Sequence, residues 1–249
     1  MPDTEHYPAA PRRSFRPRLW AVVLTAIFAT VSVRLGNWQG ERAEYRIGQQ
    51  TQLDAALTAA PLAFADIGVG ANAGQTLRYR ALSATGFFVA DELFYVDNRI
   101  VDGAAGYGLL QSFRVDITGG ESRTLLVDRG WVKASRDRAS LPGAVAPIGQ
   151  VTIIGRINSP PSRNPGTFNN AGGQRLNYVN IAEMAIRLRR DVEPFILEQI
   201  EGPGLIAFAR VPPGANSEKN RGYQLQWYAF ATMAVIIFLV LSFRKMDTV

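Results

Sequence analysis

Two apolar stretches lie at opposite ends of the chain, separated by a long polar region. The first covers residues 19–33 and follows several arginines; the second covers residues 225–243 and is followed by Arg244 and Lys245. A helix needs about 20 apolar residues to cross a hydrocarbon core of ~30 Å at 1.5 Å per residue. The second stretch is uncharged and long enough, so we expect a transmembrane helix there.

The first stretch is shorter and allows two interpretations. It ends at Arg34 and could be the apolar region of a cleavable signal peptide. However, no clear Ala-x-Ala cleavage site precedes Arg34, and a snorkelling arginine lets the apolar segment continue towards Leu35 and Trp38. We therefore expect a second membrane span.

Two spans place both tails on one side of the membrane and the middle of the chain on the other. Long domains translocate largely regardless of their charge, so the tails decide the orientation, and we place them in the cytoplasm. Asp3 and Glu5 argue against a mitochondrial transit peptide and favour a bacterial inner membrane with a periplasmic domain. The expected order is tail 1–18, helix 19–38, domain 39–222, helix 223–243 and tail 244–249.

The residue types present exclude several functions. The chain has no cysteine, and its one histidine is His6 in the N-terminal tail. Disulfides, thiolate metal ligands, zinc sites and histidine-containing catalytic triads are therefore not expected in the domain. The net charge of +6 is not clustered, so no nucleic-acid partner is expected.

The middle region is predicted to be a β-rich α+β domain. A polar helix is expected over residues 37–60, ending at Pro61, and a short amphipathic helix over residues 180–190. Alternating apolar and polar residues predict the strands: these cover residues 77–89, 92–100, 107–117, 123–134, 151–157, 194–200 and 205–211. Turn signals at Ala90-Asp91, Asp102-Gly103 and Gly119-Gly120 favour an antiparallel meander among the first four.

Two catalytic arrangements remain compatible with these residue types. Lys133 and Ser135 share one face of a strand and could form a Ser-Lys dyad, as in a membrane-tethered extracytoplasmic hydrolase. A pair of carboxylates could also serve as acid and base; the candidates are Asp91, Glu92, Asp97 and Asp128. Such residues at strand ends are usually solvated, which favours a binding function.

Two motifs could form binding surfaces. Residues 96–99 (VDNR) and 127–130 (VDRG) each put Asp and Arg at a strand end, and the second continues into Trp131. They indicate either strand-end ion pairs or a docking surface built on Arg129 and Trp131. Residues 222–228 (GYQLQWY) indicate either an ordinary aromatic belt or a site at the membrane surface for an amphipathic cofactor or a membrane partner.

The order and spacing of several motifs resemble the Surfeit locus protein 1 family, the assembly factors of haem-copper cytochrome c oxidase. The matching segments cover nearly the whole chain: residues 35–39 (LGNWQ), 79–80, 86–88 (GFF), 97–99 (DNR), 106–108 (GYG), 127–132 (VDRGWV), Arg136, 177–180 (NYVN), Met184 and 223–228 (YQLQWY).

The resemblance implies a non-enzymatic inner-membrane protein with two spans and an extracytoplasmic domain. It implies that the chain assists haem a insertion into subunit I of the oxidase or stabilises subunit I. The expected partners are subunit I, the haem a synthesis machinery and the lipid bilayer. Some bacterial members of the family bind haem a, so transient haem a binding is implied as well.

The chain departs from the family pattern just before the second span. Family members commonly carry a histidine there, whereas the matching position here is Asn220. Asparagine is a poor iron ligand compared with imidazole, which calls axial ligation into question. The resemblance then implies cofactor contacts from Arg221, which could pair with a propionate, and from Tyr223, Trp227 and Tyr228.

Overall fold

The computed structural model describes residues 13–68, 73–117, 120–137, 140–160, 170 and 173–245. Residues 1–12 with His6, residues 161–169, residues 246–249 and Gly119 of the expected Gly119-Gly120 turn lie outside this range. The chain forms two compact units, which we call the helix unit and the barrel unit. The helix unit combines Met1–Gln50 with Pro212–Val249, and the barrel unit is Thr51–Val211.

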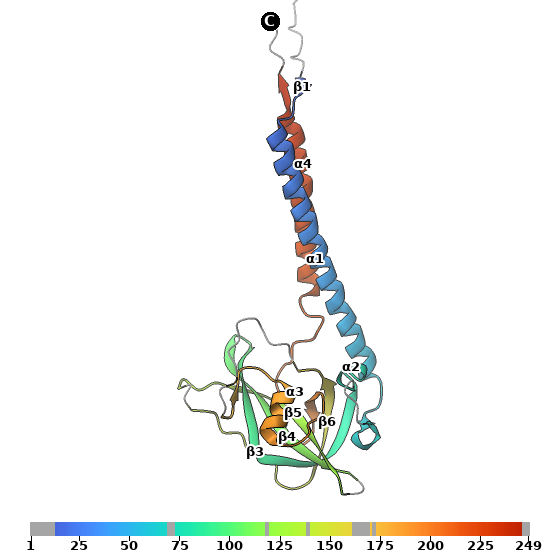
Figure 1. Ribbon diagram of the computed structural model, residues 1–249, viewed down its shortest axis with the longest axis vertical. Helices are drawn as coiled ribbons and strands as arrows, with labels where there is room; N and C mark the ends of the chain where they lie inside the picture. Colours follow the sequence, from blue (N-terminus) through green and yellow to red (C-terminus); the bar gives the residue numbers. More distant parts are fainter. Residues whose placement is uncertain are drawn as a thin grey trace, which may run out of the picture. The chain divides into compact units, whose positions relative to one another are not determined.

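The helix unit is an antiparallel pair of long helices, α1 (Leu19–Leu57) and α4 (Ser217–Ser242), which lie side by side in Figure 1. The short strands β1 (Arg13–Phe15) and β9 (Phe243–Lys245) pair at one end, so the two tails emerge together. The first apolar stretch and the expected helix at residues 37–60 form one continuous helix. No proline or turn signal interrupts this segment before Pro61.

Both helices carry apolar segments suited to a bilayer. Their apolar windows have mean hydropathies of 1.8 and 1.9, yet only 11% of the residues in each window are buried within the protein. A core helix of a water-soluble protein would hide such a surface, whereas lipid tails accept it without cost. The chain is therefore a membrane protein, with two apolar helices on either side of a sheet-rich domain in the sequence.

The barrel unit is built on a closed ring of five strands, β3-β4-β5-β8-β6, which returns from β6 to β3. Closure pairs strand edges that would otherwise remain open. The strands are β2 (Leu62–Ala63), β3 (Ala81–Val101), β4 (Ala104–Asp116), β5 (Ser122–Lys133), β6 (Val151–Asn158), β7 (Arg175–Leu176) and β8 (Ile196–Glu201). The helices are η1 (Phe64–Asp66), α2 (Ala73–Thr76) and α3 (Ile181–Leu188).

The first two predicted strands are a single strand, β3, so the expected turn at Ala90-Asp91 is wrong. A register shift between Phe88 and Leu93 occurs there instead, within the part of β3 that pairs with β4; the earlier part, Ala81 to Gly86, pairs with β6. An irregularity of this kind bends a strand without ending it. The expected turn at Asp102-Gly103 is confirmed: both residues have positive φ angles, 48° and 76°, as a two-residue hairpin requires.

The predicted strand at residues 205–211 is not formed. Its only recorded pairing is an isolated bridge between Ile206 and Gly130, where the Ile206 amide donates to the Arg129 carbonyl. Pro203 and Pro212 flank this segment and cannot donate to a sheet, which limits its pairing. The other predicted strands and the helix near residues 180–190 are present, with shifted ends.

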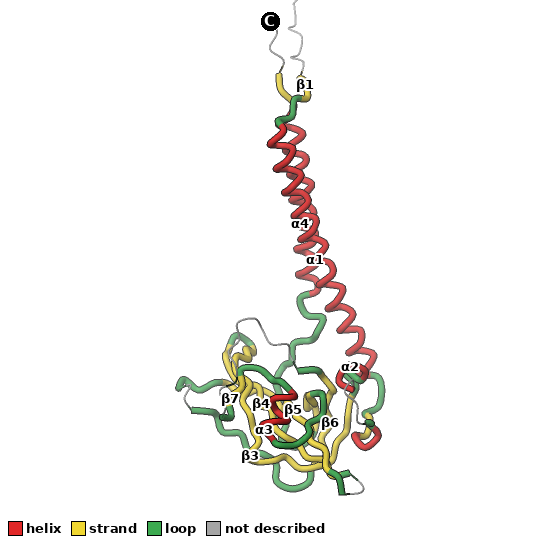
Figure 2. Tube along the Cα trace, in the orientation of Figure 1, coloured by secondary structure: helices red, strands yellow, loops and turns green. Residues whose placement is uncertain are grey.

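Alternation along the strands separates two apolar clusters. Leu125 and Val127 belong to one cluster, whereas Leu126, between them, belongs to the other, because successive strand residues point to opposite faces. The second cluster lies beneath α3, whose Met184 is only 2% exposed. Figure 2 shows this short helix against the yellow strands. The Asn180 side chain caps the helix by accepting from the Glu183 amide.

Candidate functional site

Side chains of α4 pack against α1 at the polar end of the helix unit, which we define as residues 36–44 of α1 and 220–228 of α4. Gly36 and Gly40 leave space for the side chains of Tyr228 and Gln224. A Cβ atom on Gly36 would lie 2.5 Å from Cε1 of Tyr228, which is closer than atoms can pack. The two glycines therefore make room for these two side chains of α4 between the helices.

Hydrogen bonds join the helices at this end. The Tyr228 hydroxyl donates to Oδ1 of Asn37 at 2.7 Å, and Gln224 Nε2 donates to the Tyr228 hydroxyl at 3.3 Å. Nearer the helix start, Arg221 forms an ion pair with Glu44 at 3.1 Å. Polar contacts between membrane helices typically stabilise by about 0.6 kcal/mol each, so the set fixes register more than it adds stability.

Asn220 lies inside the same helix contact. It is 8% exposed, and among the described residues its Nδ2 atom has no hydrogen-bond acceptor. A buried donor without a partner carries a desolvation cost of about 1–3 kcal/mol. The side chain at the position where the family pattern has histidine is therefore enclosed by protein.

A different face of α4 carries aromatic side chains at helical spacing. Tyr223, Trp227 and Phe230 recur at i, i+4 and i+7, which places them in one row that we call the aromatic stripe. Trp227 and Phe230 stack edge to face with centroids 5.7 Å apart, and the Lys219 ammonium lies 5.9 Å from the Tyr223 ring centroid. Tyr223 and Phe230 are exposed. The aromatic stripe is available to a partner.

The structure thus divides the four expected cofactor residues into two pairs. Tyr228 and Arg221 are engaged with Asn37 and Glu44 across the helix contact. Tyr223 and Trp227 belong to the exposed aromatic stripe. They share a helix end, as the sequence indicated, but they do not converge on one ligand position.

Arg129 does not lie on a docking surface, as we had expected; it is 2% exposed inside the barrel unit. Its guanidinium donates to the Gly204 carbonyl at 2.8 Å, to Oε1 of Gln111 at 2.5 Å and to the Val145 carbonyl at 2.8 Å. Burial lowers the pKa of Arg129, because the charged form loses hydration. The side chain joins three segments of the barrel unit and does not reach a partner.

Trp131, the other expected docking residue, is partly buried. Its Nε1 donates to the Arg99 carbonyl at 3.0 Å, and its ring lies where a side chain on Gly106 would project. The two strand-end motifs are therefore joined, because the tryptophan after VDRG bonds the arginine of VDNR. Part of the ring remains accessible for contact with another molecule.

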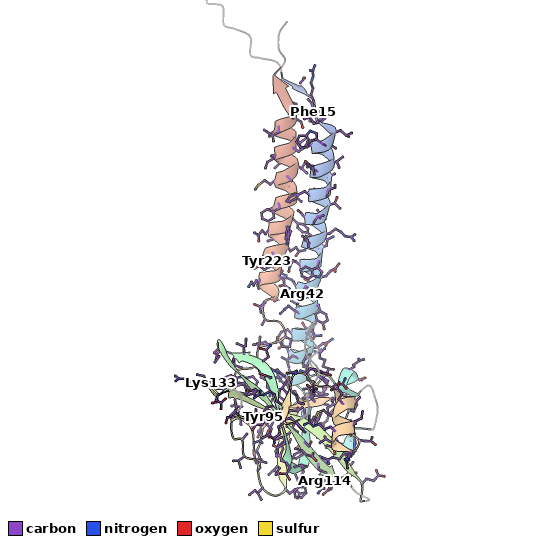
Figure 3. The ribbon with its side chains drawn as sticks, turned by 60° about the vertical axis from the view of Figure 1, so that its left-hand side comes forward. Phe15, Arg42, Tyr95, Arg114, Lys133 and Tyr223 are labelled. Carbon is purple, nitrogen blue, oxygen red and sulfur yellow. The ribbon has the colours of Figure 1, made fainter. Side chains whose placement is uncertain are left out.

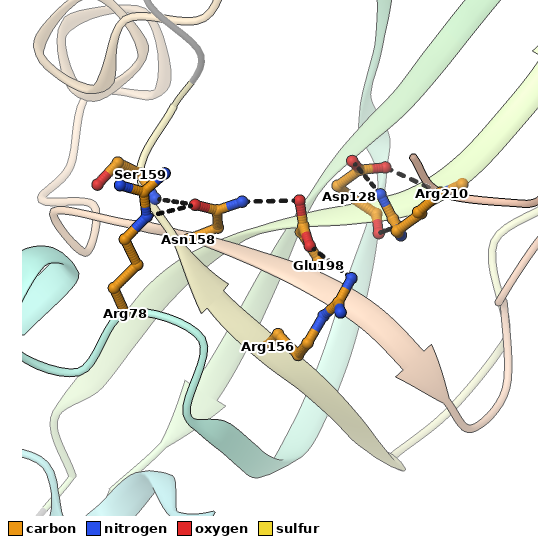
Figure 4. A network of polar contacts seen from close by, with 8 residues as sticks. Arg78, Asp128, Arg156, Asn158, Ser159, Glu198 and Arg210 are labelled. Atoms are coloured by element: carbon orange, nitrogen blue, oxygen red, sulfur yellow. Dashed lines mark hydrogen bonds and ion pairs between the residues drawn. The ribbon is translucent and has the colours of Figure 1, made fainter. Parts of the chain in front are cut away.

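The strand-end aspartate of VDRG forms an ion pair with a distant residue. Asp128 accepts from Arg210 at 2.9 Å, which ties the segment after β8 to the ring. On the next strand, Glu198 accepts from Arg156 at 3.1 Å and from Asn158 at 2.9 Å (Figure 4). Of the four candidate carboxylates, Asp128 is thus paired with Arg210 and Glu92 with Arg190, which gives no support to an acid and base pair.

The candidate dyad also lacks the environment that its chemistry needs. A catalytic lysine of this kind must be removed from water so that it can be deprotonated. Lys133 and Ser135 are both exposed, and Lys133 projects from the end of β5 in Figure 3. The arrangement gives no support to a hydrolase.

The sequence contains one further pattern that predicts the contact between α1 and α4, a row of small residues on α1. Small residues recur on one face of α1 at spacings of three and four, the pattern of closely packed membrane helices. They are Ala21, Thr25, Ala29, Ser32, Gly36, Gly40 and Ala43, all buried or partly buried. We call this row the small-residue stripe.

Together, the apolar helix pair, its polar end and the sheet-rich domain define a two-helix membrane protein. Residues 26–232 match the model of the SURF1 family. The chain belongs to the SURF1 family, whose members are generally cytochrome oxidase assembly factors.

The similar proteins include SURF1-like proteins of Mycobacterium bovis and Mycobacterium tuberculosis, both named as uncharacterised. Each is 28% identical over 165 residues, which cover 64% of this chain and 58% of the relative. The chain therefore matches less than two thirds of these relatives, and they carry no established activity to transfer.

Proposed function

We propose that this protein assists assembly of a haem-copper cytochrome c oxidase by holding subunit I while haem a is inserted. The proposal places it in the bacterial inner membrane, with the barrel unit in the periplasm and both tails in the cytoplasm. The observation that carries it is the aromatic stripe, which offers an exposed contact surface on a helix of a SURF1-family chain.

The donor set at the polar end does not fit axial ligation of haem iron. Imidazole and thiolate are the usual strong ligands, but Asn220 supplies an amide, and the only histidine is His6. The Asn220 side chain is also enclosed between the helices. The proposed action is therefore on subunit I, with haem a held by other components.

The stripe is suited to protein contact at the membrane surface. Aromatic residues dominate binding surfaces because they bury large apolar areas with few rotatable bonds. Trp227 and Phe230 already stack on one another, which reduces the entropy lost when a partner binds. Lys219 adds a cation beside Tyr223 and favours a partner with an acidic or carbonyl-rich edge.

The test replaces Trp227 by Ala in the full-length protein. Haem a is measured from reduced-minus-oxidised membrane spectra, and subunit I and the variant are quantified in the same membranes. We expect haem a to fall several-fold with the variant still in the membrane. Loss of haem a with subunit I retained supports insertion, and loss of both supports stabilisation.

The matched control is Tyr45→Ala, which removes an exposed aromatic side chain from α1 instead of α4. This variant should keep the normal spectrum. Unchanged haem a and subunit I in the Trp227→Ala strain would overturn the proposed role of the aromatic stripe.

A further inference from the structure

A groove opens between the helices at the end opposite the polar end. We call it the tail groove; it begins at Arg16 and Arg18 and continues between α1 and α4. Its volume is about 520 Å³, within the range of small-molecule sites. All of its lining belongs to the helix unit.

The groove has a narrow floor and apolar walls. Ala21 and Thr25 of the small-residue stripe are too short to fill the space between the helices. Leu24 and Phe28 line it from α1, and Leu241 lines it from α4; all three are exposed. Large apolar side chains thus flank the small residues Ala21 and Thr25, so water would solvate the groove between them poorly.

The length of the groove corresponds to one leaflet of a bilayer. Ten residues separate Arg18 from Phe28, which is ~15 Å along a helix at 1.5 Å per residue. A hydrocarbon core is ~30 Å thick, so ~15 Å is the depth of one leaflet. With the arginines at the headgroup level, Phe28 lies near the middle of the bilayer.

The charge at the opening is positive. The Arg16 amide donates to the Ser242 carbonyl at 2.9 Å, which holds this segment beside the end of α4. Pairing of β1 with β9 places Arg13 and Lys245 opposite each other in the adjoining strands. The sequence has no acidic residue from 13 to 40 or from 219 to 245, so these cations have no carboxylate nearby in sequence.

A transmembrane helix of another protein satisfies less of the groove than a lipid does. Its apolar side chains could cover the walls, but a helix would leave Arg16 and Arg18 at the opening without an anion.

We propose that the tail groove binds one anionic phospholipid, with its phosphate against Arg16 and Arg18 and one acyl chain extending towards Phe28. Cations near a membrane surface attract anionic lipids. The apolar side chains that line the groove replace the contacts that the acyl chain would make with other lipids. This site lies apart from the aromatic stripe, so it does not depend on the proposed assembly function.

The test uses the full-length protein in a non-ionic detergent. It is incubated with equal amounts of phosphatidylglycerol and phosphatidylcholine carrying identical acyl chains, and retained lipid is identified by native mass spectrometry. We expect one phosphatidylglycerol per chain to be retained in preference to phosphatidylcholine. Equal retention of the two lipids by the unaltered protein would overturn the proposal.

Two variants separate headgroup recognition from chain binding. Arg16→Gln with Arg18→Gln should reduce the preference for phosphatidylglycerol by roughly thirtyfold, since each surface cation contributes about 1 kcal/mol. Leu24→Trp should reduce retention of both lipids, because the larger ring occupies the channel. An unchanged preference in the arginine variant would contradict the assignment of the phosphate position.

Matched controls exist on the same helix. Arg34→Gln removes an arginine beyond the groove, and Val23→Trp enlarges an exposed neighbour that does not line it; both should behave as the unaltered protein does. A photoreactive residue at position 24 in cells adds a second readout. Crosslinks to phospholipid would support the proposal, and crosslinks only to a protein helix would overturn it.

Discussion

The barrel unit and the helix unit both bury polar side chains, but they do so differently. In the barrel unit, buried Arg129 donates to three acceptors. In the helix unit, Asn220 is buried with its Nδ2 atom unbonded among the described residues, and close packing rests on Gly36 and Gly40. The comparison teaches that several acceptors hold a buried arginine in the barrel unit, whereas in the helix unit small residues make room for polar side chains of α4.

The largest expected effect comes from breaking the polar interior of the barrel unit. Arg129→Met leaves the acceptors on Gly204, Gln111 and Val145 without their donor. Removing one side of a buried polar network costs several kcal/mol, so we expect the full-length protein to lose about 3 kcal/mol of unfolding free energy. Denaturant titration in detergent, followed by tryptophan fluorescence in a background where Trp20, Trp38 and Trp227 are replaced by Phe, measures this loss through Trp131.

The control for that measurement is Arg114→Met on β4, whose side chain is 52% exposed and lies 3.6 Å from Asp116. It should change stability by less than about 0.5 kcal/mol. Equal losses in the two variants would show that Arg129 does not hold the barrel unit together.

An intermediate effect is expected from overfilling the helix contact. Gly36→Leu forces a side chain against the Tyr228 ring, and overpacking of this kind costs about 1–3 kcal/mol. The chain has no cysteine, so cysteines introduced at Arg46 and Ala215, which a 2.6 Å hydrogen bond joins across the helix unit, can be linked cleanly by a bismaleimide reagent. The crosslinked fraction should fall about tenfold.

Gly48→Leu provides the comparison on the same helix, because no atom lies within 4 Å of a Cβ built at Gly48. Crosslinking should be retained in this variant. If Gly36→Leu crosslinks as well as Gly48→Leu does, the small-residue stripe is not what sets the distance between the helices.

The smallest effect is expected at the ion pair of the polar end. Arg221→Gln removes the contact with Glu44, but both side chains are about half exposed or more. Exposed pairs contribute about 0–1 kcal/mol, so crosslinking in the same assay should change less than twofold. A tenfold loss would show that charge, and not small residues, holds the helices together.

The sequence predicted the two apolar helices because length and composition decide membrane insertion. It also located most strands, because the alternation of apolar and polar residues can be read within each short segment of the sequence. It missed the continuity of β3 at Ala90, where a register shift in the pairing with β4 bends the strand without ending it. It predicted a strand at residues 205–211, whose local pattern could not reveal which residues would meet a neighbouring strand; Ile206 bridges to Gly130.

The candidate site was predicted less completely. Residues 221–228 were identified together, but local spacing could not show that Tyr228 faces Asn37 while Tyr223 faces outward. Arg129 was misplaced because an arginine at a strand end is usually solvated, and its three acceptors come from segments distant in sequence. Contacts of this kind arise only when the ring closes.

The separation of α1 from α4 along the chain has a consequence for biosynthesis. The ribosome completes Leu57 long before it begins Ser217, and at about 5–20 residues per second the interval is roughly ten to thirty seconds. During that time the small-residue stripe of α1 lies in the bilayer without its partner. Gly36 and Gly40 leave room for side chains of another helix, so we expect the nascent protein to be open to contacts with other membrane proteins until its own second helix is made.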